Sequence, residues 1–287
     1  MNSQNPAVHT QAERDYQKVR MQAFWSDIWG RLTGSSTELL SFDEVKQKLR
    51  LRDDRYLGLR DIPLDNIVGS VGRYKDFNRN FLPRRTINKD RWKAVDALTL
   101  GLEGFPPIEV YKVGDAYFVL DGNHRVSVAR ANGMQTIEAY VTEFSTDVPF
   151  TKDTEHDELF IKEGYADFLL KTRLKKIRPD ASDVILTEPG RYNQIWNHIE
   201  VHRYFMGLNC DCPVTWEEAV ASWYDHVYEP MVEAIRDHNL LEDFPGRTEA
   251  DLYVWLIKHQ GDMRAQFGGD PMQPDETVDD FLEKLNH

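Results

Sequence analysis

The stretch FVLDGNHRVSVARANG, Phe118–Gly133, decides how the first half of this chain folds. Its opening residues, Phe118–Leu120, are apolar strand formers, whereas HRVSVARAN has the spacing of a short helix with Gly133 placed to end it. Between the two stand an Asp, a Gly, an Asn, a His and an Arg, residues 121–125. The sequence therefore predicts a strand, a tight polar turn at Gly122 and a helix.

A turn of this kind can bind an anion. The first N–H groups of a helix have no helical partner, and the helix dipole adds positive potential there. Gly122 would let an anion approach the backbone closely, Arg125 could hold two phosphate oxygens in a fork, and Asn123 and His124 are short donors. The sequence thus predicts a phosphate site. An ordinary Asp-Gly turn with Asn123 as N-cap is the alternative.

The neighbouring segments predict a small domain of mixed α and β structure. PPIEVYKVGDAYFVLDG predicts a β-hairpin that reverses at Gly114-Asp115, and TIEAYVTEF alternates as a half-buried strand does. DIPLDNIVGSVGRY predicts an extended segment followed by a glycine-rich turn. Helices are expected over AERDYQKVRMQAFWSDIWGRL, from Arg91 to Leu100, and after a capping-box pair, Ser41 and Glu44.

Composition changes after Phe144, where STDVPFTKDTEHDE is polar and lacks apolar periodicity, and the remaining spacing is mainly helical. Two capping-box pairs are expected to begin helices there, and one proline to kink or break a helix: Thr215/Glu218, Thr248/Asp251 and Pro230. The sequence predicts an α+β protein in three parts: an N-terminal helical segment (1–59), a small mixed-sheet domain (60–150) and an acidic, mostly helical domain (151–287).

Charge is spread unevenly along the chain, whose formal net charge is −13. Residues 1–150 hold 21 basic and 20 acidic residues, which leaves 14 basic and 28 acidic residues, a net charge of −14, in residues 151–287. The acidic part is a candidate surface for a protein partner. The stretch Arg73–Lys93 is locally basic and could face an anion or be a solvated surface. DNA binding is expected to be weak, since phosphate neutralisation needs a positive field.

Residues 60–144 resemble the core of the ParB N-terminal/sulfiredoxin superfamily. That family shows a Pro-Ile-x-Val strand, a hairpin, a Gly-x-x-Arg turn opening a helix, and a further strand, as PPIEVYKVGDAYFVLDGNHRVSVARANGMQTIEAYV does here. The resemblance implies a nucleotide-binding domain, with ATP, ADP or CTP as ligand and magnesium as its companion. It implies that Gly122, His124 and Arg125 contact phosphates. The sulfiredoxin cysteine is replaced by Asn123, which excludes sulfinic-acid repair with that nucleophile.

Two more features bear on this site. GSVGR, Gly69–Arg73, could form a second wall for phosphate, with Ser70, Gly72 and Arg73 among its donors, or be a flexible loop. Asp121 is the candidate catalytic base or magnesium-orienting group, because a phosphotransferase needs an acid near the hydroxyl that it activates. Its alternative role is to fix the turn by accepting backbone hydrogen bonds.

Three functions remain open from the sequence. The first is a nucleotide-binding enzyme that transfers or hydrolyses a phosphate. The second is a bacterial ParB-like nucleotide switch or DNA-associated regulator without such chemistry, and the third is an interaction scaffold that uses the acidic helical part. The sequence identifies neither the base, nor an acceptor, nor the oligomeric state.

The remaining signals are weaker. No apolar run has the length of a membrane span, and the two cysteines, Cys210 and Cys212, are too close in sequence to staple a fold, so a cytoplasmic protein is expected. His198 and His202 share a helix face that could suit a divalent metal, but no third ligand is evident, so a packed pair is the favoured interpretation and no metal site is expected.

Overall fold

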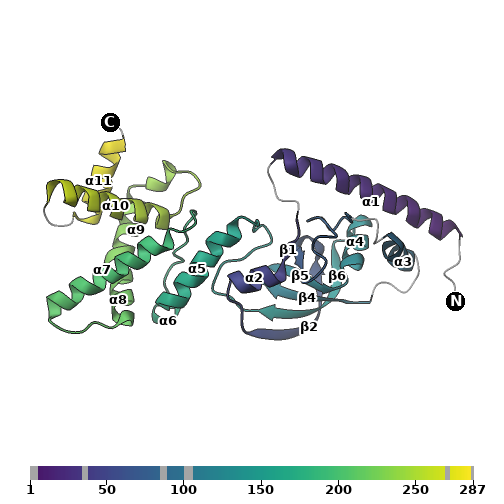
Figure 1. Ribbon diagram of the computed structural model, residues 1–287, viewed down its shortest axis with the longest axis horizontal. Coiled ribbons are helices and arrows are strands. Elements are labelled where there is room, and N and C mark those ends of the chain that lie inside the picture. The colour runs from purple at the N-terminus through teal and green to yellow at the C-terminus, as the bar shows by residue number, and fades with distance from the viewer. Residues whose placement is uncertain (1–5, 34–37, 85–88, 100–105, 269–271, 286–287) are drawn as a thin grey trace. The chain divides into compact units, whose positions relative to one another are not determined.

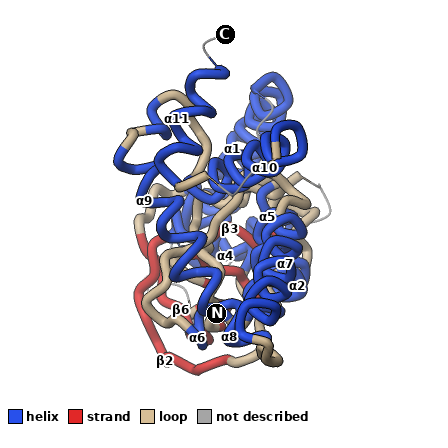
Figure 2. The backbone as a smooth tube through the Cα atoms, turned by 90° about the vertical axis from the view of Figure 1, so that its left-hand side faces the viewer, coloured by secondary structure: helices blue, strands red, loops and turns tan. Residues whose placement is uncertain are grey.

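The computed structural model describes residues 6–33, 38–84, 89–99, 106–268 and 272–285 (Figure 1). The chain divides into two compact units, Met1–Leu159 and Phe160–His287. The fold is α+β: a six-stranded mixed sheet belongs to the first unit, and the second unit is helical. Every strand among the described residues lies before Ser145; strands are coloured red in Figure 2.

The sheet has the strand order β1-β3-β5-β4-β6-β2. The pairs β1/β3, β3/β5 and β4/β6 are parallel, whereas β4/β5 and β2/β6 are antiparallel. The expected hairpin is confirmed, and so is the strand over 136–144. The strands are β1 (Leu40–Ser41), β2 (Asp54–Pro63), β3 (Ile67–Ser70), β4 (Ile108–Val113), β5 (Ala116–Asp121) and β6 (Thr136–Phe144).

The opening stretch folds as the sequence predicts. β5 ends at Asp121, Gly122 is the N-cap residue of helix α4 (Asn123–Ala131), and Gly133 follows the helix with a φ of +71°. The apolar face of α4 contributes Val126 and Ala129 to the core, where they meet side chains from one face of the sheet. The sheet members of this core include Ile108, Val110, Val119, Ile137, Ala139 and Val141.

Three further helices belong to the first unit: α1 (Pro6–Thr33), α2 (Phe42–Lys48) and α3 (Lys89–Thr99). A second small core joins α1 and α3 to α4. Trp92 is fully buried there, packs against the ring of Tyr16 at 5.6 Å between centroids, and donates its indole N–H to Ser127 Oγ at 2.9 Å. These contacts fix the face that α3 presents to the start of α4.

Three expectations about this unit differ from the structure. Residues 1–59 are not a separate helical segment, because they supply β1 and the first part of β2 to the sheet. The division between units falls after Leu159 instead of at 150. The capping box of α2 does not form either: Ser41 pairs with Ser70 in the sheet and caps no helix N–H, while Glu44 lies 3.6 Å from His156.

The second unit is built from helices, which begin with α5 across the division. Both expected capping boxes are present, Thr215 with Glu218 and Thr248 with Asp251. Pro230 stands in the first turn of α9 after five residues of π-helix, so the helical path continues through it with altered winding. The helices are α5 (Glu158–Thr172), α6 (Leu174–Ile177), α7 (Tyr192–Cys210), α8 (Trp216–Trp223), α9 (Glu229–Asp237), α10 (Glu249–Phe267) and α11 (Pro274–Leu285).

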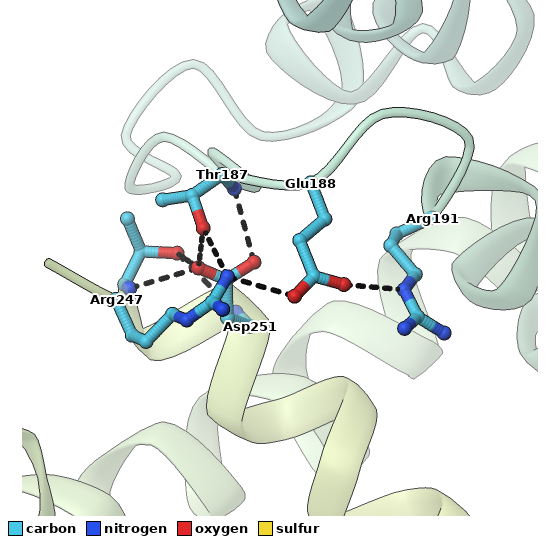
Figure 3. A network of polar contacts seen from close by, with 6 residues as sticks. Thr187, Glu188, Arg191, Arg247 and Asp251 are labelled. Atoms are coloured by element: carbon cyan, nitrogen blue, oxygen red, sulfur yellow. Dashed lines mark hydrogen bonds and ion pairs between the residues drawn. The ribbon is translucent and has the colours of Figure 1, made fainter. Parts of the chain in front are cut away.

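A polar network closes the loop before α7 onto the start of α10 (Figure 3). The buried carboxylate of Asp251 accepts hydrogen bonds from Thr187 N at 3.0 Å, Thr187 Oγ1 at 2.7 Å and Thr248 N at 3.0 Å. Arg247 bonds Thr187 Oγ1 at 3.0 Å and Glu188 at 2.8 Å. Because each acceptor of Asp251 is used within the fold, this cluster is structural.

The cysteine pair and the histidine pair noted in the sequence both lie in this unit. Cys210 and Cys212 form a disulfide, which links residues two apart at the end of α7 and joins no distant elements. His198 contacts the hydroxyl of Tyr253, and His202 lies 3.0 Å from Ser222 Oγ, so each histidine bonds a different side chain. Among the described residues, no helix is long and apolar enough to cross a membrane, and no three potential ligands gather to hold a metal ion.

Candidate anion-binding site

A cavity of about 300 Å³ opens where the loop after β3 meets the start of α4. Both expected walls line it, and α3 adds a third wall. From the loop come Gly72 and Arg73, from α3 come Arg91 and Val95, and from the end of β5 and the start of α4 come Leu120, Asp121, Gly122, Asn123, His124 and Arg125.

Gly122 has a role that the sequence did not show. Its φ is +117°, and a Cβ added there would lie 2.5 Å from Ile108 Cγ2 and 2.9 Å from Ile108 Cβ. The side chain of Ile108 is fully buried in the core. Close packing under the turn therefore requires glycine, in addition to any approach of an anion from the cavity. No side chain caps α4, so its first N–H groups remain unsatisfied by the helix.

His124 is the most unusual residue of the cavity. Its side chain is only 5% exposed, yet neither ring nitrogen has a hydrogen-bond partner among the described residues. Its ring meets Phe77 edge-on, at 5.3 Å between centroids. Burial, together with the smaller effect of the positive charges of Arg91 and Arg73, lowers the pKa of His124 to about 4. The imidazole is therefore neutral at pH 7 and has an unused donor and an unused acceptor.

Asn123 connects the two polypeptide walls. Its Nδ2 approaches the carbonyl oxygen of Gly72 at 3.5 Å, while its Oδ1 is buried without a partner. Together with His124, it leaves three buried polar atoms unsatisfied at one cavity. Buried polar atoms are rarely left without hydrogen bonds, so this cluster gives the cavity a free capacity for polar contacts.

Hydrogen bonds within the fold hold the guanidinium of Arg125, so it is not freely available to bind two phosphate oxygens. Its Nη1 donates to the carbonyl oxygens of Pro106 at 2.9 Å and Pro107 at 2.6 Å, and its Nη2 pairs with the carboxylate of Asp121. The Arg125 side chain is 17% exposed, whereas Asp121 is 61% exposed. Asp121 thus serves as the ion-pair partner of Arg125.

Two other arginines face the cavity with their charges available. The guanidinium groups of Arg73 and Arg91 form no hydrogen bond or ion pair with any residue that the structure describes, and both residues are exposed. Sequence reasoning missed Arg91 as a site residue. Its only signal was membership of the basic stretch, because the docking of α3 through Trp92 is a tertiary contact.

Apart from Arg73 and Arg91, most cations of the basic stretch form ion pairs within the fold, so the stretch is not a continuous positive surface. Lys89 and Lys93 both donate to Glu13 and hold the pKa of that carboxyl at about 2. The ion pairs of the stretch are Arg79 with Glu155, Arg84 with Glu38, and the two lysines with Glu13.

Ser70 does not line the cavity. It is fully buried, and its hydroxyl contacts the carbonyl oxygens of Gly72 and Val119, the latter at 3.0 Å. Ser70 therefore shapes the loop that carries Gly72 and Arg73, and it faces the sheet. Of the eight expected site residues, the other seven line one cavity: Asp121, Gly122, Asn123, His124, Arg125, Gly72 and Arg73.

Comparison with known proteins gives a distant structural neighbour. No protein-family model and no curated protein sequence matches this chain. Among solved structures, sulfiredoxin from Arabidopsis thaliana is similar to part of the chain, with 20% sequence identity and a TM-score of 0.23. The match covers 29% of this chain and 82% of the sulfiredoxin chain.

Proposed function

We propose that the cavity at the start of α4 binds the phosphate groups of a nucleotide. The observation that carries the proposal is the buried His124, whose two ring nitrogens lack partners. Around it lie the uncapped start of α4 and the guanidinium groups of Arg73 and Arg91. Backbone N–H groups and arginines at a helix start are the groups that recognise phosphate.

The pairing of Arg125 with Asp121 suggests how the site responds to its ligand. Phosphate oxygens compete with the Asp121 carboxylate for Nη2 of Arg125, while the carbonyl oxygens of Pro106 and Pro107 keep the guanidinium in place. A phosphate that takes over Nη2 releases Asp121 beside the bound group. Asp121 is then placed to orient magnesium or to accept a proton from a hydroxyl, which is the basis for phosphate transfer or hydrolysis at this site.

A DNA-associated switch is the less favoured function. It needs a positive surface for the DNA backbone, and ion pairs within the fold engage four of the eight cations of the basic stretch, Arg79, Arg84, Lys89 and Lys93. The acidic second unit adds further negative charge.

Calorimetry with tripolyphosphate and with adenine, guanine and cytosine nucleotides, with and without magnesium, tests the proposal. Arg91→Ala should weaken binding about ten- to hundred-fold, the effect of losing a charge-assisted hydrogen bond worth roughly 1.5–3 kcal/mol. Lys75→Ala is the matched control, because Lys75 is an exposed cation of the same basic stretch that does not line the cavity. Equal affinities of the two variants, or no binding by the wild type, would refute the proposal.

A further inference from the structure

A second cavity, of about 330 Å³, lies on the open face of the same sheet. It is lined mainly by tyrosine and by apolar side chains, with a few polar groups. The residues are Tyr56, Glu109, Val110, Tyr111, Leu120, Tyr140 and Thr142.

Among the described residues of the first unit, α2 packs on one end of this face of the sheet. Phe42 of α2 packs on Tyr111 and Phe118, with ring centroids 4.6 and 5.5 Å apart. Beyond this contact, Tyr56 is 64% exposed and Tyr140 is 42% exposed. Leu120 and Leu59 on the same sheet are 40% and 43% exposed. Such a group of large apolar side chains at a cavity marks a binding surface more often than single exposed residues do.

The second cavity lies next to the phosphate cavity. Leu120 lines both. Asp121 of the first cavity and Glu109 of the second are direct partners across the antiparallel β5/β4 pair. Neighbouring strands lie about 4.8 Å apart, so the two cavities are separated by a ridge one strand wide that carries two carboxylates.

We propose that the second cavity holds the base of the same nucleotide, with the ribose on the ridge between the cavities; this inference rests on the proposed function of the phosphate cavity. A base has two flat faces that stack on tyrosine, and polar edges that Thr142 and Glu109 can meet. The carboxylates of Asp121 and Glu109 are acceptors for the ribose hydroxyls. The two cavities together have a size typical of small-molecule sites, roughly 300–1,000 Å³.

The order of the three regions supports this assignment. Cations and the helix start lie at one end, carboxylates in the middle and tyrosines at the other end. A nucleotide has the matching order of anionic phosphates, neutral hydroxyl-bearing sugar and planar base. A ligand with a second anionic group would instead bring that charge against Glu109.

The test compares tripolyphosphate with the nucleoside triphosphate that binds best, by calorimetry on the full chain. Tyr140→Ala should reduce nucleotide affinity about five- to hundred-fold, the range of base–aromatic stacking, and leave tripolyphosphate affinity unchanged. Tyr140→Phe keeps the ring and should bind nucleotide as the wild type does. Tyr204→Ala is the control, because Tyr204 is a 64% exposed tyrosine on α7 of the other unit.

Each outcome separates this inference from the proposed function. Tripolyphosphate binding with no selective effect of Tyr140→Ala on the nucleotide would overturn the inference and leave the phosphate site intact. Absence of tripolyphosphate and nucleotide binding in the wild type would overturn both. A selective loss in Tyr140→Ala that Tyr140→Phe does not show would support both.

Discussion

Replacing Gly122 by alanine should destabilise the first unit through two separable effects. The backbone at Gly122 has a φ of +117°, and left-handed backbone costs an L-residue roughly 1–2 kcal/mol. The new Cβ would also lie 2.5 Å from Ile108 Cγ2, and overpacking of this kind adds roughly 1–3 kcal/mol. We therefore expect Gly122→Ala to lower the free energy of unfolding of this unit by about 2–5 kcal/mol.

Two other glycines serve as matched controls. Gly133 has a φ of +71° but open space around its Cβ position, so Gly133→Ala should show only the backbone effect of roughly 1–2 kcal/mol. Gly72 lines the same cavity as Gly122, has no positive φ and has open space, so Gly72→Ala should change stability by less than about 0.5 kcal/mol. The difference between Gly122→Ala and Gly133→Ala measures the steric contacts of the new Cβ, chiefly with Ile108 and, at 3.2 Å, with Nε of Arg125.

The measurement must report on the first unit, because a chain with two compact units need not unfold in one step. Native-state hydrogen exchange of the amides in β5 and α4, followed by mass spectrometry across a urea series, gives that local stability. If Gly122→Ala is no less stable than Gly133→Ala, the packing argument for the turn is wrong.

The remaining predictions concern His124, the second unit and DNA. The pKa of His124 is about 4 in the folded chain and about 6.5 in the unfolded chain, so anion binding that raises this pKa takes up protons. Affinity for tripolyphosphate should therefore rise as the pH falls from 7 to 5, more in the wild type than in His124→Gln, as calorimetry in buffers of different ionisation enthalpy would show. Equal proton uptake in both would contradict this. Asp251→Ala leaves buried donors without an acceptor and should lower the free energy of unfolding by at least about 2 kcal/mol in urea titrations. Replacement of the exposed Asp237 by alanine should change this free energy little, and equal effects of the two variants would contradict a structural role of Asp251. Nonspecific DNA binding should be weak at physiological salt by fluorescence anisotropy, given the net charge of −14 in residues 151–287, and tight, salt-sensitive binding would refute that.

Local patterns in the sequence were enough to locate the turn and most of the elements around it. The change from strand to helix at Gly122, the hairpin at Gly114 and the capping boxes at Thr215 and Thr248 all depend on residues close together in the chain. The capping box at Ser41 failed because β1 pairing, a contact with a distant strand, determines the backbone there.

The candidate site was predictable only in part, for the same reason. The polar residues of the turn are visible in the sequence, but the burial of His124 depends on the packing of Phe77 and neighbouring elements. Arg91 enters the cavity because Trp92 fixes α3 against α4, and Ser70 leaves it because its hydroxyl faces the sheet. Such long-range contacts leave no periodic signal in the chain.

The unsatisfied imidazole of His124 sets stability and ligand recognition against each other. A buried polar group without a hydrogen bond typically weakens a fold by roughly 1–3 kcal/mol. Apolar replacements at this position would therefore rank high in any screen that selects only for heat resistance. Directed evolution for thermostability alone would therefore favour the loss of the proposed phosphate site, so such a campaign on this protein has to select for phosphate binding at the same time.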